Sequence, residues 1–138
     1  MTATSTIRIL IVDDSALLRD AVRRMLSDTD SLEVCGEACN GYEALEKAAQ
    51  LMPQVIVMDI GMPAMDGLEA TRRLQQAKAA SEVLIFTEHD SEHARDACLG
   101  AGARGYLSKS RAYQLADAIR AVAHHETYDV FQLRGHRV

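Results

Sequence analysis

The chain has 138 residues, of which 48% are hydrophobic and 25% are charged, a size and balance that predict one globular domain. Its formal net charge of −5 argues against this domain binding nucleic acid by itself, because contacts with phosphates require a positive surface. The first residues lack the basic and apolar stretches of a signal peptide, and no apolar run approaches the roughly 20 residues of a membrane span, so we expect a cytoplasmic protein without membrane contact.

In the first half of the chain, apolar runs alternate with amphipathic stretches. Short continuous apolar runs predict buried strands, and apolar residues three and four positions apart predict one face of a helix. The expected strands are residues 7–12, 32–37 and 55–58. The apolar faces of the two helices between them consist of Leu18, Ala21, Val22 and Met25, and of Ala44, Leu45 and Ala48. The second helix should end near Pro53, because the residue before a proline disfavours helix.

The same alternation continues through the second half of the chain. Further strands are expected at residues 83–86 and 105–107. The apolar faces of the three remaining helices consist of Leu68, Thr71 and Leu74 after Gly67, of Ala94, Ala97, Cys98 and Ala101, and of Leu115, Ala118, Ile119, Val122 and Ala123. Five strands that each precede a helix predict an α/β fold of the (βα)₅ type, in which continuous apolar strands form a parallel sheet.

The expected architecture is a doubly wound, flavodoxin-like fold with a five-stranded parallel sheet in the order 2-1-3-4-5. One domain should cover residues 6–125, and residues 126–138 should form a C-terminal tail or the start of a linker. In such folds the working site lies at the carboxyl ends of the strands.

Polar residues follow the predicted strands at that edge of the sheet: Asp13 and Asp14 after the first, Asp59 after the third, Thr87 after the fourth and Lys109 after the fifth. Three neighbouring carboxylates repel one another unless a cation compensates them, and Mg²⁺ prefers oxygen ligands of this kind. Lysine and threonine add a positive charge and a hydrogen-bond donor for phosphoryl oxygens. Asp59 is the predicted nucleophile, because a carboxylate can form an acyl phosphate.

Residues 57–67, Val-Met-Asp-Ile-Gly-Met-Pro-Ala-Met-Asp-Gly, resemble the phosphoacceptor segment of response-regulator receiver domains of two-component systems. The aspartate pair, the threonine and the lysine stand at this family's expected positions around that segment, and the resemblance covers residues 6–124. Thr-Glu-His-Asp at 87–90 and Gly-Ala-Arg-Gly-Tyr-Leu at 102–107 resemble the nitrate-response and LuxR-type branch, most members of which carry a C-terminal helix-turn-helix.

This resemblance implies a chemotaxis-regulator-like fold. It also implies a signalling switch that catalyses only its own phosphorylation and dephosphorylation and is otherwise no enzyme. A histidine kinase or phosphotransfer protein would phosphorylate the aspartate that follows the third strand. Control of transcription would follow if a helix-turn-helix comes next, and a homodimer is one assembly that the resemblance allows.

The resemblance also implies a role for each site residue. The ligands of Mg²⁺ would be Asp13, Asp14, Asp59 and the backbone carbonyl of Gly61. Lys109 would contact the phosphoryl group, Thr87 would swing toward it, and Tyr106 would turn inward, which would change the surface of helix 4, strand 5 and helix 5.

Two residues depart from the family's pattern. Ser110 follows Lys109 where proline is usual, so we expect no cis-prolyl bond there. Glu88 follows Thr87 where a small residue is common. A large acid beside the phosphoryl pocket is expected to modulate the rate of phosphorylation.

Each residue of the predicted site also has an ordinary structural interpretation. Asp13, Asp14 and Ser15 can cap a helix, Thr87 can be a plain strand-end hydroxyl, and Lys109 can be a solvated lysine. Coincidence at four neighbouring strand ends is a much weaker explanation than one shared site.

Three other functions compete with a phosphorylated switch. A haloacid-dehalogenase-type hydrolase needs an acid two residues after the nucleophile, where this chain has Gly61. A flavin carrier needs a phosphate-cradling first loop, where this chain has Asp13 and Asp14. A stand-alone or degenerate receiver, acting as a phosphorelay intermediate or protein-interaction module, remains the alternative.

Overall fold

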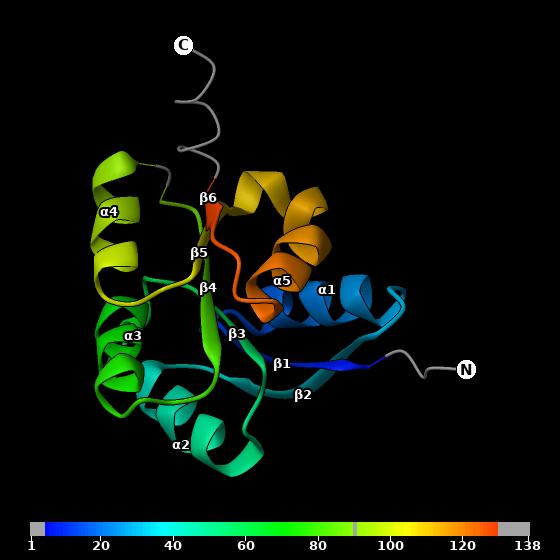
Figure 1. Ribbon diagram of the computed structural model, residues 1–138, viewed down its shortest axis with the longest axis horizontal. Coiled ribbons are helices and arrows are strands. Elements are labelled where there is room, and N and C mark those ends of the chain that lie inside the picture. Colours follow the sequence, from blue (N-terminus) through cyan, green and yellow to red (C-terminus); the bar gives the residue numbers. More distant parts are fainter. Residues whose placement is uncertain (1–4, 90, 130–138) are drawn as a thin grey trace.

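The computed structural model describes residues 5–89 and 91–129. Its centre is a parallel sheet with strand order β2-β1-β3-β4-β5-β6, covered by helices on both faces (Figure 1). The strands are β1 (Ile7–Val12), β2 (Leu32–Ala38), β3 (Val55–Met58), β4 (Glu82–Thr87), β5 (Gly105–Ser108) and β6 (Tyr128–Asp129). The helices are α1 (Ala16–Ser27), α2 (Gly41–Leu51), α3 (Gly67–Gln76), α4 (Glu92–Gly100), the 3₁₀ helix η1 (Lys109–Gln114) and α5 (Leu115–Ala123).

The predicted α/β fold and the order of the first five strands are confirmed. The structure adds a sixth strand, β6, which lies within the predicted tail and pairs in parallel with β5. Two residues are too few to show a periodic pattern, so this strand is defined only by its pairing with the open edge of β5. Residues 130–138, the rest of the predicted tail, lie outside the described residues.

Alternate side chains of the strands pack into two separate cores. In β1, Ile7, Ile9 and Ile11 face α1 and α5, whereas Leu10 and Val12 face α2, α3 and α4. Successive side chains of a strand point to opposite faces of the sheet, so a strand covered on both sides must be apolar at nearly every position. This requirement explains the continuous apolar runs of the sequence.

The apolar face predicted for the first helix is partly wrong. The structure buries Val22 and Leu26 of α1, while Ala21 and Met25 are exposed. Leu18, Val22 and Leu26 are four residues apart and therefore lie in one row along the helix. The apolar residues of α1 could form either of two adjacent helix faces. The face with Leu18, Val22 and Leu26 is the one that packs against the sheet.

No helix of the described residues has the length and apolar character needed to cross a bilayer.

Candidate functional site

The loops after β1 and β3 bring the three predicted carboxylates together. β1 and β3 are adjacent strands, and the amide of Asp59 donates a hydrogen bond of 3.0 Å to the carbonyl of Val12. One carboxylate oxygen from each of Asp13, Asp14 and Asp59 lies within 4.8 Å of the others. Asp13 and Asp59 are buried, whereas Asp14 is exposed. The cluster is therefore a group of acids with one open side.

Lys109 bridges two of these acids. Its Nζ atom lies 2.9 Å from Oδ2 of Asp13 and 3.1 Å from Oδ2 of Asp59. Burial alone would lower the pKa of Lys109, but the hydrogen bonds to the two carboxylates outweigh it and raise the pKa above its usual value. The ammonium is therefore charged at neutral pH. Three carboxylates and one ammonium give a formal charge of −3 + 1 = −2, which a divalent cation would balance.

Asp13 is deeply buried, with 4% of its side chain exposed. Burial raises its pKa, and the hydrogen bonds from Lys109 and from the amide of Ser15 only partly offset that effect. Lys109 is less buried than Asp13 and has two carboxylate partners. Its contacts with these carboxylates therefore favour the charged form of the lysine. An additional cation would stabilise the ionised form of Asp13.

Gly67 lies against the backbone carbonyl of the acceptor, Asp59. A Cβ atom at Gly67 would lie 1.9 Å from the carbonyl oxygen of Asp59, so only glycine fits there. The amide of Gly67 also donates a hydrogen bond of 2.8 Å to the carbonyl of Ile60, while Oδ1 of Asp59 accepts one of 2.8 Å from the amide of Ile60. From the sequence, Gly67 is predicted only to precede a helix, because a single glycine does not show which backbone segment approaches it.

Thr87 and Tyr106 are both buried, on neighbouring strands. Oγ1 of Thr87 accepts a hydrogen bond of 3.4 Å from the amide of His89, and the hydroxyl of Tyr106 donates one to the carbonyl of His89. The tyrosine ring is therefore in an inward position, beneath the loop that leads from β4 to α4. The same loop residue joins the two predicted switch side chains.

The remaining predicted site residues, Gly61 and Glu88, are exposed at the rim. A Cβ atom at Gly61 would lie 3.8 Å from Nε2 of His89, so the loops after β3 and β4 approach each other there. The peptide bond between Lys109 and Ser110 is not cis, as expected from the missing proline.

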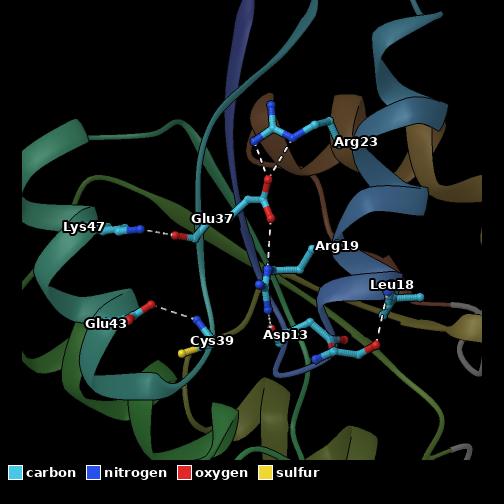
Figure 2. A network of polar contacts seen from close by, with 9 residues as sticks. Asp13, Leu18, Arg19, Arg23, Glu37, Cys39, Glu43 and Lys47 are labelled. Carbon is cyan, nitrogen blue, oxygen red and sulfur yellow. Dashed lines mark hydrogen bonds and ion pairs between the residues drawn. The ribbon is translucent and has the colours of Figure 1, made fainter.

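A polar network behind the first acid was not predicted from the sequence (Figure 2). Arg19 of α1 donates hydrogen bonds of 2.7 Å to the carbonyl of Asp13 and of 2.9 Å to Oε1 of Glu37. Arg23, one turn later, donates one of 2.8 Å to Oε2 of Glu37, and Lys47 of α2 binds the carbonyl of the same glutamate. The network ties the loop of the acid cluster to α1, β2 and α2. Two arginines four residues apart were the only sequence signal for it.

We expect Glu37→Gln to lower the free energy of unfolding by about 1 kcal/mol at neutral pH, because the charged hydrogen bonds to the two arginines are partly exposed. Burial would raise the pKa of Glu37, but the hydrogen bonds from Arg23 and Arg19 hold it below the usual 4.5. A depressed pKa contributes stability above the unfolded-state value, and this contribution disappears as the pH falls through the folded-state value.

Urea denaturation at about pH 7 and at about pH 3 checks this expectation. The difference between wild type and Glu37→Gln should be larger at the higher pH and smaller at the lower one. Glu46→Gln, at an exposed position of α2, is the matched control and should show no difference. An equal loss at both pH values would contradict the electrostatic explanation.

An apolar cavity of about 500 Å³ lies between the ends of α2 and α3 and is lined by residues that include Leu45, Ala48, Met52 and Leu74. It adjoins the amino ends of β3 and β4, whereas the acid cluster lies at the carboxyl ends of β1 and β3. The cavity therefore takes no part in the chemistry of the cluster.

The chain is similar in sequence and in structure to known proteins. The family model described as "Response regulator receiver domain" matches residues 9–122. The chain is 43% identical over 117 residues to "Response regulator GacA" of Pseudomonas protegens, a match covering 84% of this chain and 55% of that protein. It is also 38% identical over 125 residues to "Protein-glutamate methylesterase/protein-glutamine glutaminase 1" of Methanosarcina acetivorans, covering 83% of this chain and 36% of that protein.

Among solved structures, a two-component response regulator of the LuxR family from Aurantimonas sp. SI85-9A1 superimposes with a TM-score of 0.86 at 34% identity, covering 90% of this chain and 89% of that one. The chain spans about half or less of the length of the two curated relatives above.

Proposed function

This chain belongs to the response regulator receiver domain family, and from this premise we propose that it accepts a phosphoryl group on Asp59 in a Mg²⁺-dependent reaction. The donor would be a histidine kinase or a phosphotransfer protein. The observation that carries the proposal is the contact of Lys109 with both Asp13 and Asp59, beside the exposed Asp14. Membership of this family also argues against the two other functions considered, a haloacid-dehalogenase-type hydrolase and a flavin carrier.

The residues at the cluster fit a magnesium ion. Asp13, Asp14 and Asp59 offer oxygen ligands at one point, and the carbonyl of Gly61 lies in the loop after the acceptor. Mg²⁺ is bound in proteins by a few carboxylates together with phosphate oxygens. When bound, it would neutralise charge on the phosphoryl oxygens during transfer.

The chain's own residues would perform the remaining steps. A carboxylate oxygen of Asp59 forms the new bond to phosphorus, and the bond between phosphorus and the donor atom breaks, with its electron pair leaving on the donor. The ammonium of Lys109 lies 3.1 Å from Oδ2 of Asp59 and would bind a phosphoryl oxygen. The hydroxyl of Thr87 would donate a hydrogen bond to another oxygen.

We propose that phosphorylation changes the surface formed by α4, β5 and α5. Movement of Thr87 toward the phosphoryl group would favour the inward position of the Tyr106 ring, which the structure already shows under the β4–α4 loop. The hydrogen bond from Tyr106 to the carbonyl of His89 supports this coupling, since it joins β5 to that loop. The result is a shift in population between two packings.

The experiment that tests the proposal is incubation of the chain with acetyl phosphate and Mg²⁺, followed by intact-mass measurement. We expect one added phosphoryl group, and no addition when the metal is chelated before the donor is added. Absence of any mass increase at saturating donor would overturn the proposed function.

We propose that the output is control of transcription, from a cytoplasmic protein in which a further domain follows this one. The support is the similarity to GacA and to the LuxR-family regulator, the first of which is longer than this chain. A homodimer stays a prediction, as does a stand-alone receiver that relays phosphoryl groups or binds another protein.

Glu88→Ala should speed phosphorylation by small anionic donors. Glu88 is exposed, so solvent screens its charge and the expected gain is modest, about two- to fivefold. Stopped-flow rates at low and high salt separate the causes, because only a charge effect shrinks with ionic strength. Glu88→Gln is the matched variant, since it keeps the size and removes the charge. Identical rates for all three proteins would show that this residue does not affect access to the site.

A further inference from the structure

The strand β6 occupies the open edge of β5, between α4 and the segment η1–α5 (Figure 1). It pairs in register, Gly105 with Tyr128 and Tyr106 with Asp129, and the amide of Tyr128 donates to the carbonyl of Arg104 at 3.3 Å. This edge belongs to the surface that the proposed function assigns to signal output. A segment of the chain itself is therefore docked on that surface.

Both residues of β6 are attached through their side chains. Oδ2 of Asp129 lies 2.8 Å from Nη1 of Arg95 on α4, and only 2% of the aspartate side chain is exposed. The hydroxyl of Tyr128 donates a hydrogen bond of 2.6 Å to Oε1 of Gln114, at the end of η1. Removal of one partner of a buried ion pair strongly destabilises a protein, because the other charge stays buried without compensation. The docking thus depends on a specific position of α4.

The strand partner of Asp129 is Tyr106, the predicted switch residue. Partners in a ladder project to the same face of the sheet, and here both side chains project toward α4, where Tyr106 packs with Cys98 and Asp129 binds Arg95. Because Tyr106 is the ladder partner of Asp129, an outward turn of its ring would bring it toward the Asp129–Arg95 ion pair. Docking of β6 and the inward position of Tyr106 therefore favour each other.

We propose that the β5 edge is a docking surface for the chain's own residues Tyr128–Asp129, and that phosphorylation of Asp59 tightens this docking through Tyr106 and α4. The coupling rests on the proposed function. The coupling would connect the phosphorylation site to the part of the chain after residue 129. Tyr128 and Asp129 are the first residues after α5 that pair with the sheet. By linkage, docking and phosphorylation favour each other by the same factor.

Hydrogen exchange of the backbone amides tests this proposal, with the full chain measured before and after incubation with acetyl phosphate and Mg²⁺. Intact mass gives the phosphorylated fraction of the same sample. We expect exchange at the amide of Tyr128, which donates to the carbonyl of Arg104, to slow by about fivefold or more on phosphorylation. In Asp129→Asn, exchange there should be fast in both states, while the amides of β1 and β3 stay protected and phosphorylation still occurs.

Asp28→Asn is the matched control, because Asp28 is an exposed acid at the end of α1; it should behave as wild type. Phosphorylated wild type with unchanged or faster exchange at the Tyr128 amide would overturn the coupling and leave the proposed function intact. Wild type that gains no phosphoryl group would overturn both. Asp129→Asn with wild-type exchange in the absence of donor would show that the ion pair with Arg95 does not hold β6.

Discussion

Asp59→Asn should lower phosphorylation by at least about a thousandfold, a loss of roughly 4 kcal/mol of transition-state stabilisation. The amide cannot replace the carboxylate as nucleophile, because its oxygen carries no formal charge and its nitrogen is a poor nucleophile. The substitution also removes one of the two carboxylates that Lys109 contacts. Intact-mass spectra recorded over time with acetyl phosphate and Mg²⁺ measure the effect.

Asp66→Asn is the matched control for this variant. Asp66 lies in the same loop and caps α3 by accepting a hydrogen bond of 2.8 Å from the amide of Glu69, a role that asparagine also performs. Its phosphorylation should equal that of wild type. Undiminished phosphorylation of Asp59→Asn would mean that another side chain is the acceptor, and the site assignment would be wrong.

Asp14→Ala should weaken Mg²⁺ binding by about tenfold to a hundredfold, or roughly 1.4 to 2.8 kcal/mol. Asp14 is the exposed member of the three carboxylates, so its loss opens no cavity in the core. The formal charge of the cluster falls from −2 to −1, and one direct oxygen ligand is lost. A magnesium titration followed through the amide signals of Asp13, Asp59 and Gly61 gives the dissociation constants.

Thermal stability provides a second measurement for the same variant. A magnesium concentration ten times the dissociation constant should stabilise the wild type by about 1.4 kcal/mol, and the same concentration should stabilise Asp14→Ala much less. Without metal, the two proteins should be about equally stable. Asp117→Ala removes the same charge from α5 and should bind magnesium as wild type does. Equal affinity of Asp14→Ala and wild type would require a different ligand set.

Much of the fold follows from local patterns in the chain. The strands at 7–12 and 55–58 were predicted to the residue, because a strand covered on both faces must be apolar throughout and ends where polar residues begin. Once the strand order is known, the carboxyl ends of β1 and β3 are neighbours. The meeting of Asp13, Asp14 and Asp59 was therefore predictable from the sequence, and so was the presence of Lys109 beside them.

Other features depend on contacts between distant parts of the chain, and neither part has a local sequence pattern that predicts the contact. The rotation of α1 that buries Leu26 in place of Met25 is selected by the sheet, since both residues suit an apolar face. The need for glycine at position 67 arises from the carbonyl of Asp59, and the role of Arg19 arises from Glu37 on a different element. The strand β6 has no periodicity of its own. It exists because β5 offers unpaired backbone groups and Arg95 offers a charge partner, and both lie far from Asp129 in the sequence.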